Sequence, residues 1–260
     1  MDQEVWLIDR IARLDQEAGG SSTSWPTAGL AHVIQVVDEI TGTETAIETA
    51  GAAALPAPLA DEIVGTSVLL ARLRYVSAEV VDGPPALDRQ FWIGTGKPSW
   101  VAGRSSMLNQ REFDDASQVE MPASTKPFSV GLFTSTGLPG THGLWELYID
   151  TTQSTLFSRP WRLWRVVPRA DVRLLEIPSA AAWAAFVCAY PRREGDLVFP
   201  DWRAVAADYD GVHLTLRAVV ATQGLRFVVD GMSLAPVYWG VESTFWLHWC
   251  FTEVELLHVR

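Results

Sequence analysis

A single glutamate, Glu242, lies within the aromatic and hydroxyl-rich segment VYWGVESTFWLHW at residues 237–249. If this segment is a strand, alternation places Glu242, Thr244 and His248 on one face together with Trp246. A carboxylate in such surroundings is a candidate for general acid-base catalysis, or for stabilising a positive charge that develops during a reaction. The alternative is an ordinary glutamate on the solvent-facing side of an edge strand.

Two other segments offer groups that could act with this carboxylate. The segment GLFTST at 131–136 places three hydroxyls at the end of an apolar strand, and a Gly/Pro loop and the helix-like LWELY at 144–148 follow it. The segment DRQFWIGTG at 88–96 indicates a short aromatic strand ending in a Gly-Thr-Gly turn, where backbone amides could approach a ligand closely. Hydroxyls at a strand end can also simply cap the next element, and such a turn can be ordinary.

In their order along the chain these features resemble the ADP-ribosyltransferase superfamily. In that family a first strand ends near a Gly-Thr or Gly-Ser that holds the nicotinamide amide of NAD. A second strand carries a Ser-Thr-Ser or Tyr element, and a late strand supplies the catalytic glutamate. The counterparts here would be Gly94-Thr95, Thr134-Ser135-Thr136 and Glu242. The segment PDWRAVAADYDGVHLT at 200–215 also looks like the family's helix and strand before the glutamate strand, so the resemblance covers residues 85–251.

The resemblance implies an activity and a set of site residues. Glu242 would be the catalytic carboxylate, stabilising the sugar cation as nicotinamide leaves and orienting or deprotonating the acceptor, while Ser135 would position it. The residues implied in binding NAD are Arg89, Gly94, Thr95, Phe133, Thr134, Thr136, Trp145 and Tyr148. The expected reaction is mono-ADP-ribosylation of an intracellular protein or nucleic acid with NAD as substrate, or NAD hydrolysis, as in toxins and defence effectors.

One position departs from the family pattern and leaves other interpretations open. The family commonly has His or Arg directly before the first Gly of the turn, whereas this chain has Ile93, and Arg89 or Arg104 would have to replace it. A second interpretation is therefore a non-catalytic interaction protein on a degenerate version of the same fold. A third is an enzyme acting on another nucleotide or a glycoside, with Glu242 and Asp208 or Asp210 as a carboxylate pair.

The elements that would position these residues predict an α+β fold. Helical spacing over 4–18, 26–40 and 61–76 indicates a helical N-terminal region, residues 1–82, with a loop or linker at 51–62. Residues 83–260 are expected to form a β-rich α+β domain, resembling the split-sheet domain of the ADP-ribosyltransferases. Strands are predicted over 90–93, 130–134, 161–167, 172–177, 211–220, 225–229 and 237–251, and helices over 179–189 and 202–207.

Composition bounds the cellular setting. No apolar run approaches the roughly 20 residues that span a bilayer, and the N-terminus lacks the pattern of a secretory signal. The chain has two cysteines, which does not suggest a disulfide framework. A cytoplasmic protein without a membrane partner is therefore expected. The net charge of −11 opposes a general nucleic-acid interface, although the Arg- and Trp-rich run at 159–173 leaves a local one open. His142, His213 and His248 lack metal-binding spacing, so no metal site is expected. The helical N-terminal region offers a surface for a protein partner.

Overall fold

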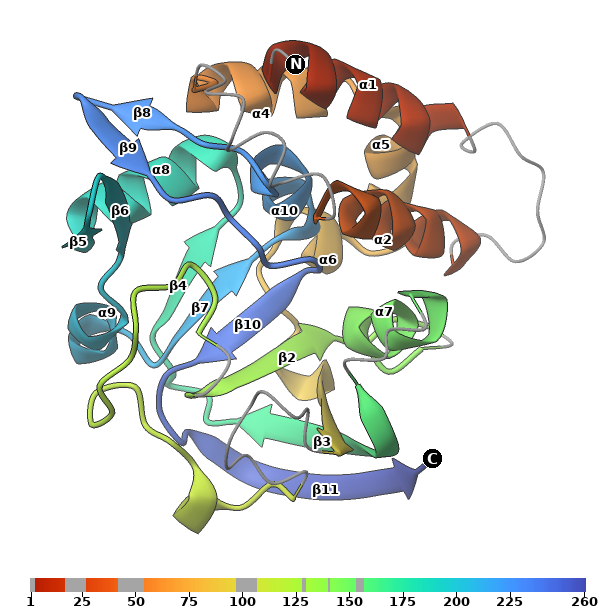
Figure 1. Ribbon diagram of the computed structural model, residues 1–260. Coiled ribbons are helices and arrows are strands. Elements are labelled where there is room, and N and C mark those ends of the chain that lie inside the picture. The colour runs from red at the N-terminus through yellow and green to blue at the C-terminus, as the bar shows by residue number, and fades with distance from the viewer. Residues whose placement is uncertain are drawn as a thin grey trace.

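The computed structural model of the 260-residue chain describes residues 3–16, 27–41, 54–96, 107–127, 130–139, 141–152 and 157–260. Its elements confirm an α+β fold, with helices gathered towards the N-terminal half and strands towards the C-terminal half (Figure 1). The helices before the first strand are α1 (Gln3–Gln16), α2 (Thr27–Thr41), α4 (Ala57–Gly65), α5 (Val68–Arg74) and α6 (Ala78–Asp82). None of the described helices is both long and apolar enough to cross a bilayer.

The N-terminal helices follow from amphipathic spacing and local capping. In α1 the predicted apolar stripe of Trp6, Leu7, Ile11 and Leu14 is buried. The single helix predicted over 61–76 is instead divided into α4 and α5, because Ser67 accepts a hydrogen bond from the amide of Leu70 and starts a new helix. The loop predicted at 51–62 is partly wrong, because α4 begins at Ala57. The prolines of this segment lie at the start of the helix, where backbone N–H groups have no partner within the helix, so a proline there removes no hydrogen bond.

A seven-stranded sheet carries the segments singled out in the sequence. Its order is β11-β3-β1-β2-β10-β7-β4, and neighbouring strands are antiparallel except for the parallel pair β4 and β7. The strands are β1 (Gln90–Gly96), β2 (Leu132–Thr136), β3 (Ser158–Pro168), β4 (Leu174–Ile177), β7 (Gly211–Leu214), β10 (Ser243–Trp246) and β11 (Phe251–Val259). β2 therefore lies between the first predicted strand and the glutamate strand.

The remaining elements lie around this sheet. The helices are α7 (Leu144–Thr152), α8 (Ala180–Ala189), α9 (Trp202–Asp208) and α10 (Leu216–Thr222). A smaller sheet, of order β5-β6-β9-β8, is formed by β5 (Pro191–Glu194), β6 (Leu197–Pro200), β8 (Val228–Val229) and β9 (Met232–Leu234). In Figure 1, α7 lies beside the end of β2, and the N-terminal helices lie beyond the same end of the large sheet.

Three of the predicted strands are wrong in extent. The strand predicted over 225–229 is reduced to β8, Val228–Val229. The strand predicted over 211–220 ends at Leu214, because Thr215 accepts a hydrogen bond from the amide of Ala218 and begins α10. α10 is buried around most of its circumference, so its sequence shows neither helical nor strand periodicity. The strand predicted over 237–251 is reduced to β10, since Gly240 with φ 77° interrupts its start and β11 begins only at Phe251.

One hydrophobic core includes both the N-terminal helices and the C-terminal part of the chain. Buried side chains from Trp6 to Val81 belong to the same cluster as Trp183, Trp239 and Phe245. Polar contacts also cross between the two parts: Arg10 of α1 donates to the carbonyls of Val219 and Gln223 at the end of α10. The boundary predicted at residue 82 thus marks a change in secondary structure, while the core extends across it.

Candidate active site

Polar side chains from four neighbouring strands form a row on one face of the large sheet. Glu176 of β4 lies opposite His213 of β7, which lies opposite Thr244 of β10. Thr244 in turn lies opposite Thr134 of β2. Because directly opposed residues in a ladder point to the same face, these side chains line up across the sheet. Glu242 immediately precedes β10, and its carboxylate joins this row.

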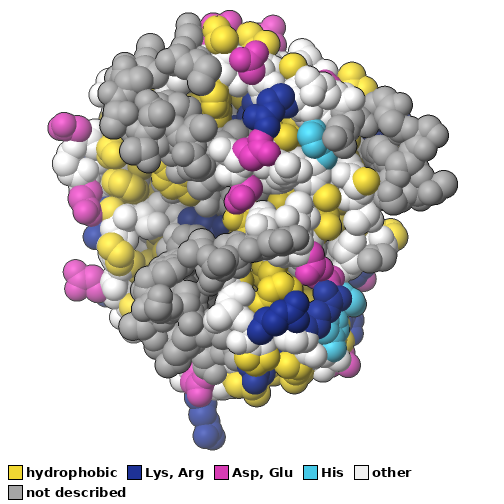
Figure 2. All heavy atoms as spheres, turned by 45° about the vertical axis from the view of Figure 1, so that its right-hand side comes forward, with side chains coloured by type: hydrophobic (Ala, Val, Ile, Leu, Met, Phe, Trp, Pro, Cys, Tyr) yellow, Lys and Arg dark blue, Asp and Glu magenta, His cyan; other side chains and the backbone are white. Residues whose placement is uncertain are grey.

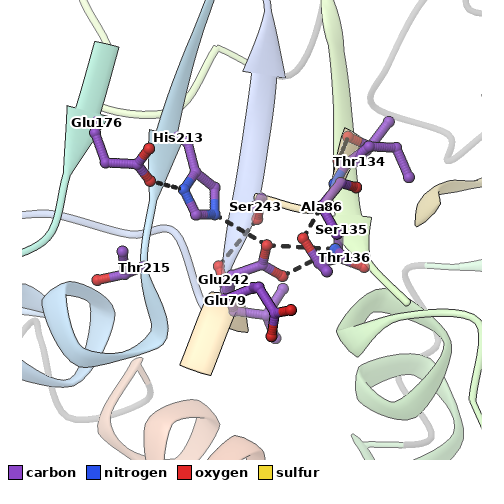
Figure 3. Close-up of polar contacts among 12 residues, drawn as sticks. Glu79, Ala86, Thr134, Ser135, Thr136, Glu176, His213, Thr215, Glu242 and Ser243 are labelled. Atoms are coloured by element: carbon purple, nitrogen blue, oxygen red, sulfur yellow. Dashed lines mark hydrogen bonds and ion pairs between the residues drawn. The ribbon is translucent and has the colours of Figure 1, made fainter. Parts of the chain in front are cut away.

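Glu242 is held by groups that are distant in the sequence. Its carboxylate accepts the backbone N–H of Thr136, with nitrogen-to-oxygen distances of 3.1 and 3.3 Å to the two oxygens, across 106 positions of the chain. Nε2 of His213 lies 3.0 Å from Oε1 of Glu242. The Glu242 side chain is fully buried. Figure 3 shows these contacts at the end of the glutamate strand. The structure therefore brings Glu242 next to the hydroxyl segment of β2.

His213 joins Glu242 to a second carboxylate. Its Nδ1 contacts Oε1 of Glu176, so each ring nitrogen faces a carboxylate oxygen. Burial lowers the pKa of His213, but the hydrogen bonds and charges of Glu176 and Glu242 outweigh it and raise the pKa to about 9. At neutral pH the ring is therefore an imidazolium between two acidic side chains. We call Glu176, His213 and Glu242 the carboxylate-histidine row.

The hydroxyls of Thr134 and Thr136 take part in a network within the sheet. Gln90 donates to Oγ1 of Thr136 at 3.0 Å, and Thr134 donates to Oε1 of Gln90 at 2.5 Å. The indole N–H of Trp246 donates to Oγ1 of Thr134 at 2.8 Å. These contacts explain why residues 134 and 136 are Thr and not Val, because the buried side chains of Gln90 and Trp246 need hydrogen-bond partners. The backbone of Thr136, which contacts Glu242, is fixed by the same network.

Ser135 lies on the other face of β2, and the role predicted for it changes. Adjacent residues of a strand point to opposite faces, so Ser135 cannot share the face of Thr136. Its hydroxyl accepts the backbone N–H of Trp145 at 3.2 Å, in the first turn of α7. Gly143 leaves room for it, because a Cβ at that position would overlap the Ser135 hydroxyl. Ser135 therefore caps α7, and the contacts that position Glu242 come from Thr136 and His213.

The aromatic residues predicted to contact nicotinamide pack on this second face. Phe133 is buried and stacks on Phe245, with ring centroids 4.4 Å apart. The Tyr148 hydroxyl donates to Asp38 of α2 at 2.7 Å. The Trp145 ring lies 4.2 Å from the ammonium of the buried Lys126. Strand alternation turns Phe133 away from the carboxylate of Glu242, because Phe133 lies opposite Phe245 in the ladder. Trp145 and Tyr148 lie on α7, where their contacts are with Lys126 and Asp38.

The remaining residues predicted to bind NAD, Arg89 and Gly94-Thr95, lie at different distances along the sheet from Glu242. Gln90 lies opposite Thr136, and Gly137 donates its N–H to the carbonyl of Arg89 at 2.7 Å, so Arg89 lies near the level of Glu242. Gly94-Thr95 lie further along, opposite Arg162 and beyond, roughly 13 Å from Gln90 at about 3.3 Å per residue. Hence Arg89, in the 3-10 turn Leu87–Arg89 just before β1, lies at the level of Glu242, and Ile93 does not. Arg104 lies outside the described residues.

The carboxylate pair proposed for a third kind of enzyme is not formed. Asp210 accepts the N–H of Leu247 at its carbonyl, which places it at the far end of β10 from Glu242. Five residues of strand correspond to about 16 Å, more than the separation of about 5–9.5 Å between paired glycosidase carboxylates. Asp210 instead accepts the N–H of Arg173, and Asp208 accepts the hydroxyl of Tyr190. The spacing of the strand therefore excludes the pair of Glu242 with Asp210.

Glu176 and His213 are the site residues that the sequence did not predict. Each stands as a single ionisable residue inside a short apolar strand, in LLEI and GVHL. A single ionisable residue in an apolar strand indicates a buried polar contact, because a charged group in a buried strand requires a partner. Comparisons with family models, curated proteins and solved structures found no match, so the chemistry of the site rests on its own residues.

Proposed function

We propose that this chain is an NAD-dependent mono-ADP-ribosyltransferase, or an NAD glycohydrolase, that modifies an intracellular protein or nucleic acid in the cytoplasm as a toxin or defence effector. The observation that carries the proposal is the position of Glu242: its carboxylate lies at the backbone of Thr136, in the strand that bears the Thr-Ser-Thr element. The order first strand, hydroxyl strand, glutamate strand is also present as spatial neighbours in the sheet. That arrangement is the one the resemblance implied.

The chemistry follows from the charge that develops when nicotinamide leaves. Cleavage of the nicotinamide-ribose bond makes the ribose carbon cationic, and a fixed carboxylate stabilises that cation more than the ground state. Glu242 has its orientation fixed on one side by the N–H of Thr136 and on another by His213. The proton released by the acceptor, or by water, goes to the Glu242 carboxylate and then to solvent. The products are nicotinamide, the ADP-ribosyl product and one proton.

Arg89 supports the same assignment. A guanidinium binds phosphate through two parallel hydrogen bonds, and Arg89 lies at the level of Glu242, just before β1. Its guanidinium contacts Glu79 at 3.3 Å in an exposed ion pair, which contributes only about 0–1 kcal/mol and is easily exchanged. The diphosphate of NAD would replace Glu79 as its partner. Because Glu242 is fully buried, NAD binding must also open the residues that cover it.

A second candidate, a non-catalytic interaction protein on the same fold, is favoured by that burial. Each oxygen of Glu242 already has a protein partner, and Phe133 is part of the core. In this case the carboxylate-histidine row would serve only to hold β4, β7 and β10 together. The N-terminal helices would then offer the partner surface. Figure 2 shows acidic and basic side chains interspersed over one face of the molecule, including the part formed by these helices.

Nicotinamide release separates the two candidates. The purified chain is incubated with NAD, with and without cell lysate as a source of acceptor, beside Glu242→Gln and the control Glu253→Gln, an exposed glutamate on β11. We expect release by the wild type and by Glu253→Gln, and a loss of at least 100-fold in Glu242→Gln, the scale of general-base and electrostatic contributions. Absence of release from the wild type under both conditions favours the interaction protein.

A further inference from the structure

The carboxylate-histidine row runs from the protein interior to its surface. Glu242 and His213 are fully buried, while the Glu176 side chain is 31% exposed. Glu176 contacts Nδ1 of the ring, and Nε2 lies 3.0 Å from Glu242 (Figure 3). The three residues come from three adjacent strands, so the sheet itself fixes their order. His213 is therefore the only described link between the buried carboxylate and Glu176.

The two contacts favour the doubly protonated form of the ring. A neutral imidazole has one N–H and one lone pair, so it can donate to only one of two flanking carboxylates. Donation to both Glu176 and Glu242 requires the imidazolium. Glu176 and Glu242 are also the charges that act on the ring, while Glu79 of the neighbouring α6 has its own partner in Arg89. Thr244, which lies opposite His213, and Thr136, which contacts Glu242, do not carry charge.

Loss of that proton changes the environment of Glu242. A neutral ring turns a lone pair towards one of the carboxylates, and the resulting repulsion releases either Glu176 or Glu242 from its fixed orientation. Space around Glu176 is restricted by Gly83, where a Cβ would overlap its Oε1. Gly83 has φ 79°, a conformation that favours glycine, so the close approach is built into the backbone. The backbone of Gly83 therefore lies close to Glu176 at one end of the row, and the N–H of Thr136 contacts Glu242 at the other.

We propose that His213 is a positioning residue for Glu242, kept as an imidazolium by Glu176, and that this row makes the orientation of the Glu242 carboxylate depend on solvent pH. The role of His213 in turnover rests on the proposed function; the protonation of the row does not. Glu176 and His213 contact neither substrate nor the reacting atoms. Their effect is expected in kcat, because they fix the carboxylate, with KM for NAD little changed.

Imidazole nitrogen NMR tests the protonation without any activity. The His213 signals are assigned by their loss in His213→Gln, and the ring is titrated in the wild type, Glu176→Gln and the control Glu253→Gln. We expect the wild-type ring to be doubly protonated at pH 8, and Glu176→Gln to lower its titration midpoint by roughly one to three pH units, the usual effect of an opposite charge. A wild-type midpoint near 6.5, or an unchanged midpoint in Glu176→Gln, would overturn the proposal.

The pH profile of nicotinamide release tests the coupling to turnover. We expect kcat of the wild type to be constant up to pH 8 and to fall above it, and the fall to move to lower pH in Glu176→Gln by the shift seen in NMR. Superimposable profiles for wild type and Glu176→Gln would overturn the coupling. If the wild type releases no nicotinamide at any pH, the proposed function fails, and the NMR titration still decides the protonation of the row. Should Glu176→Gln not fold, the wild-type titration alone remains decisive.

Discussion

At the scale of single residues, His213 makes the stability of the protein depend on pH. Its pKa is about 9 in the folded chain and 6.5 as the ordinary value. A raised pKa means that the stabilisation is fully present below about pH 6.5 and is lost as pH rises through about 9. At 1.36 kcal/mol per unit, the difference is on the order of 3 kcal/mol.

Urea unfolding at pH 6 and pH 10 measures this dependence. We expect the free energy of unfolding of the wild type to fall between the two values by about 3 kcal/mol more than that of His213→Gln, which lacks the titrating group. Comparing the two proteins removes the contribution of other groups that titrate in this range. The same pH dependence in both would show that His213 is not stabilised as an imidazolium.

Residues also mark the limit of what sequence could predict. Glu242 and the hydroxyl segment could be singled out, because a lone carboxylate and three successive hydroxyls are unusual in apolar strands. The partners of Glu242 could not be, since Glu176 reaches His213 only through the parallel pairing of β4 with β7 across 37 positions. Side-chain alternation predicts that Thr244 shares a face with Glu242, and the same alternation places Ser135 on the opposite face from Thr136.

At the scale of elements, Ser135 connects β2 to α7 and gives a test that differs from the one for Glu242. Its hydroxyl accepts the N–H of Trp145 in the first turn of α7. We expect Ser135→Ala to lower the free energy of unfolding by about 1 kcal/mol, the usual effect of losing a helix cap, and to leave nicotinamide release per folded molecule unchanged.

Thermal unfolding and the nicotinamide assay, run on the same preparations, measure both quantities. Glu242→Gln gives the reference for a loss of activity, and Glu253→Gln for a surface substitution without effect. A loss of activity in Ser135→Ala as large as that in Glu242→Gln, with no change in stability, would return Ser135 to the catalytic role that the family resemblance implied.

The boundaries of α1 and α10 show when the spacing of apolar residues predicts a helix and when it does not. Amphipathic α1 was predicted within two residues at each end, because one of its faces remains polar. α10, with Leu216, Val219 and Val220 all buried, has no polar face, and its β-branched residues predict a strand. The sequence feature that indicates a helix here is the N-cap residue Thr215. A single capping residue is a weaker signal than the apolar run that follows it.

At the scale of the whole molecule, Arg10 joins the first helix to the last part of the core. It is buried, and burial lowers its pKa to about 9. Its guanidinium donates to two carbonyls at the end of α10, where unsatisfied carbonyls need partners. We expect Arg10→Gln to lower the free energy of unfolding by about 1–3 kcal/mol, because it removes the donor to the buried carbonyls of Val219 and Gln223. Arg13→Gln, which removes an exposed ion pair with Glu39, should change it by less than about 1 kcal/mol.

Chemical unfolding monitored by circular dichroism and by tryptophan fluorescence tests this. Because the N-terminal helices share one core with the rest, we expect a single transition in which both signals coincide, in the wild type and in both variants. Two separate transitions, with Arg10→Gln affecting only one of them, would show that the helical N-terminal region, residues 1–82, folds independently of the rest.

The contact between Arg10 and residues 219 and 223 also sets an order of events during translation. Residue 10 leaves the ribosome more than 200 residues before the carbonyls that it binds. At about 5–20 residues per second, this corresponds to roughly 10–40 s of elongation. Throughout that time Arg10 lacks the carbonyls that it binds in the folded chain, so this contact of the N-terminal segment forms only after residue 223 has been made.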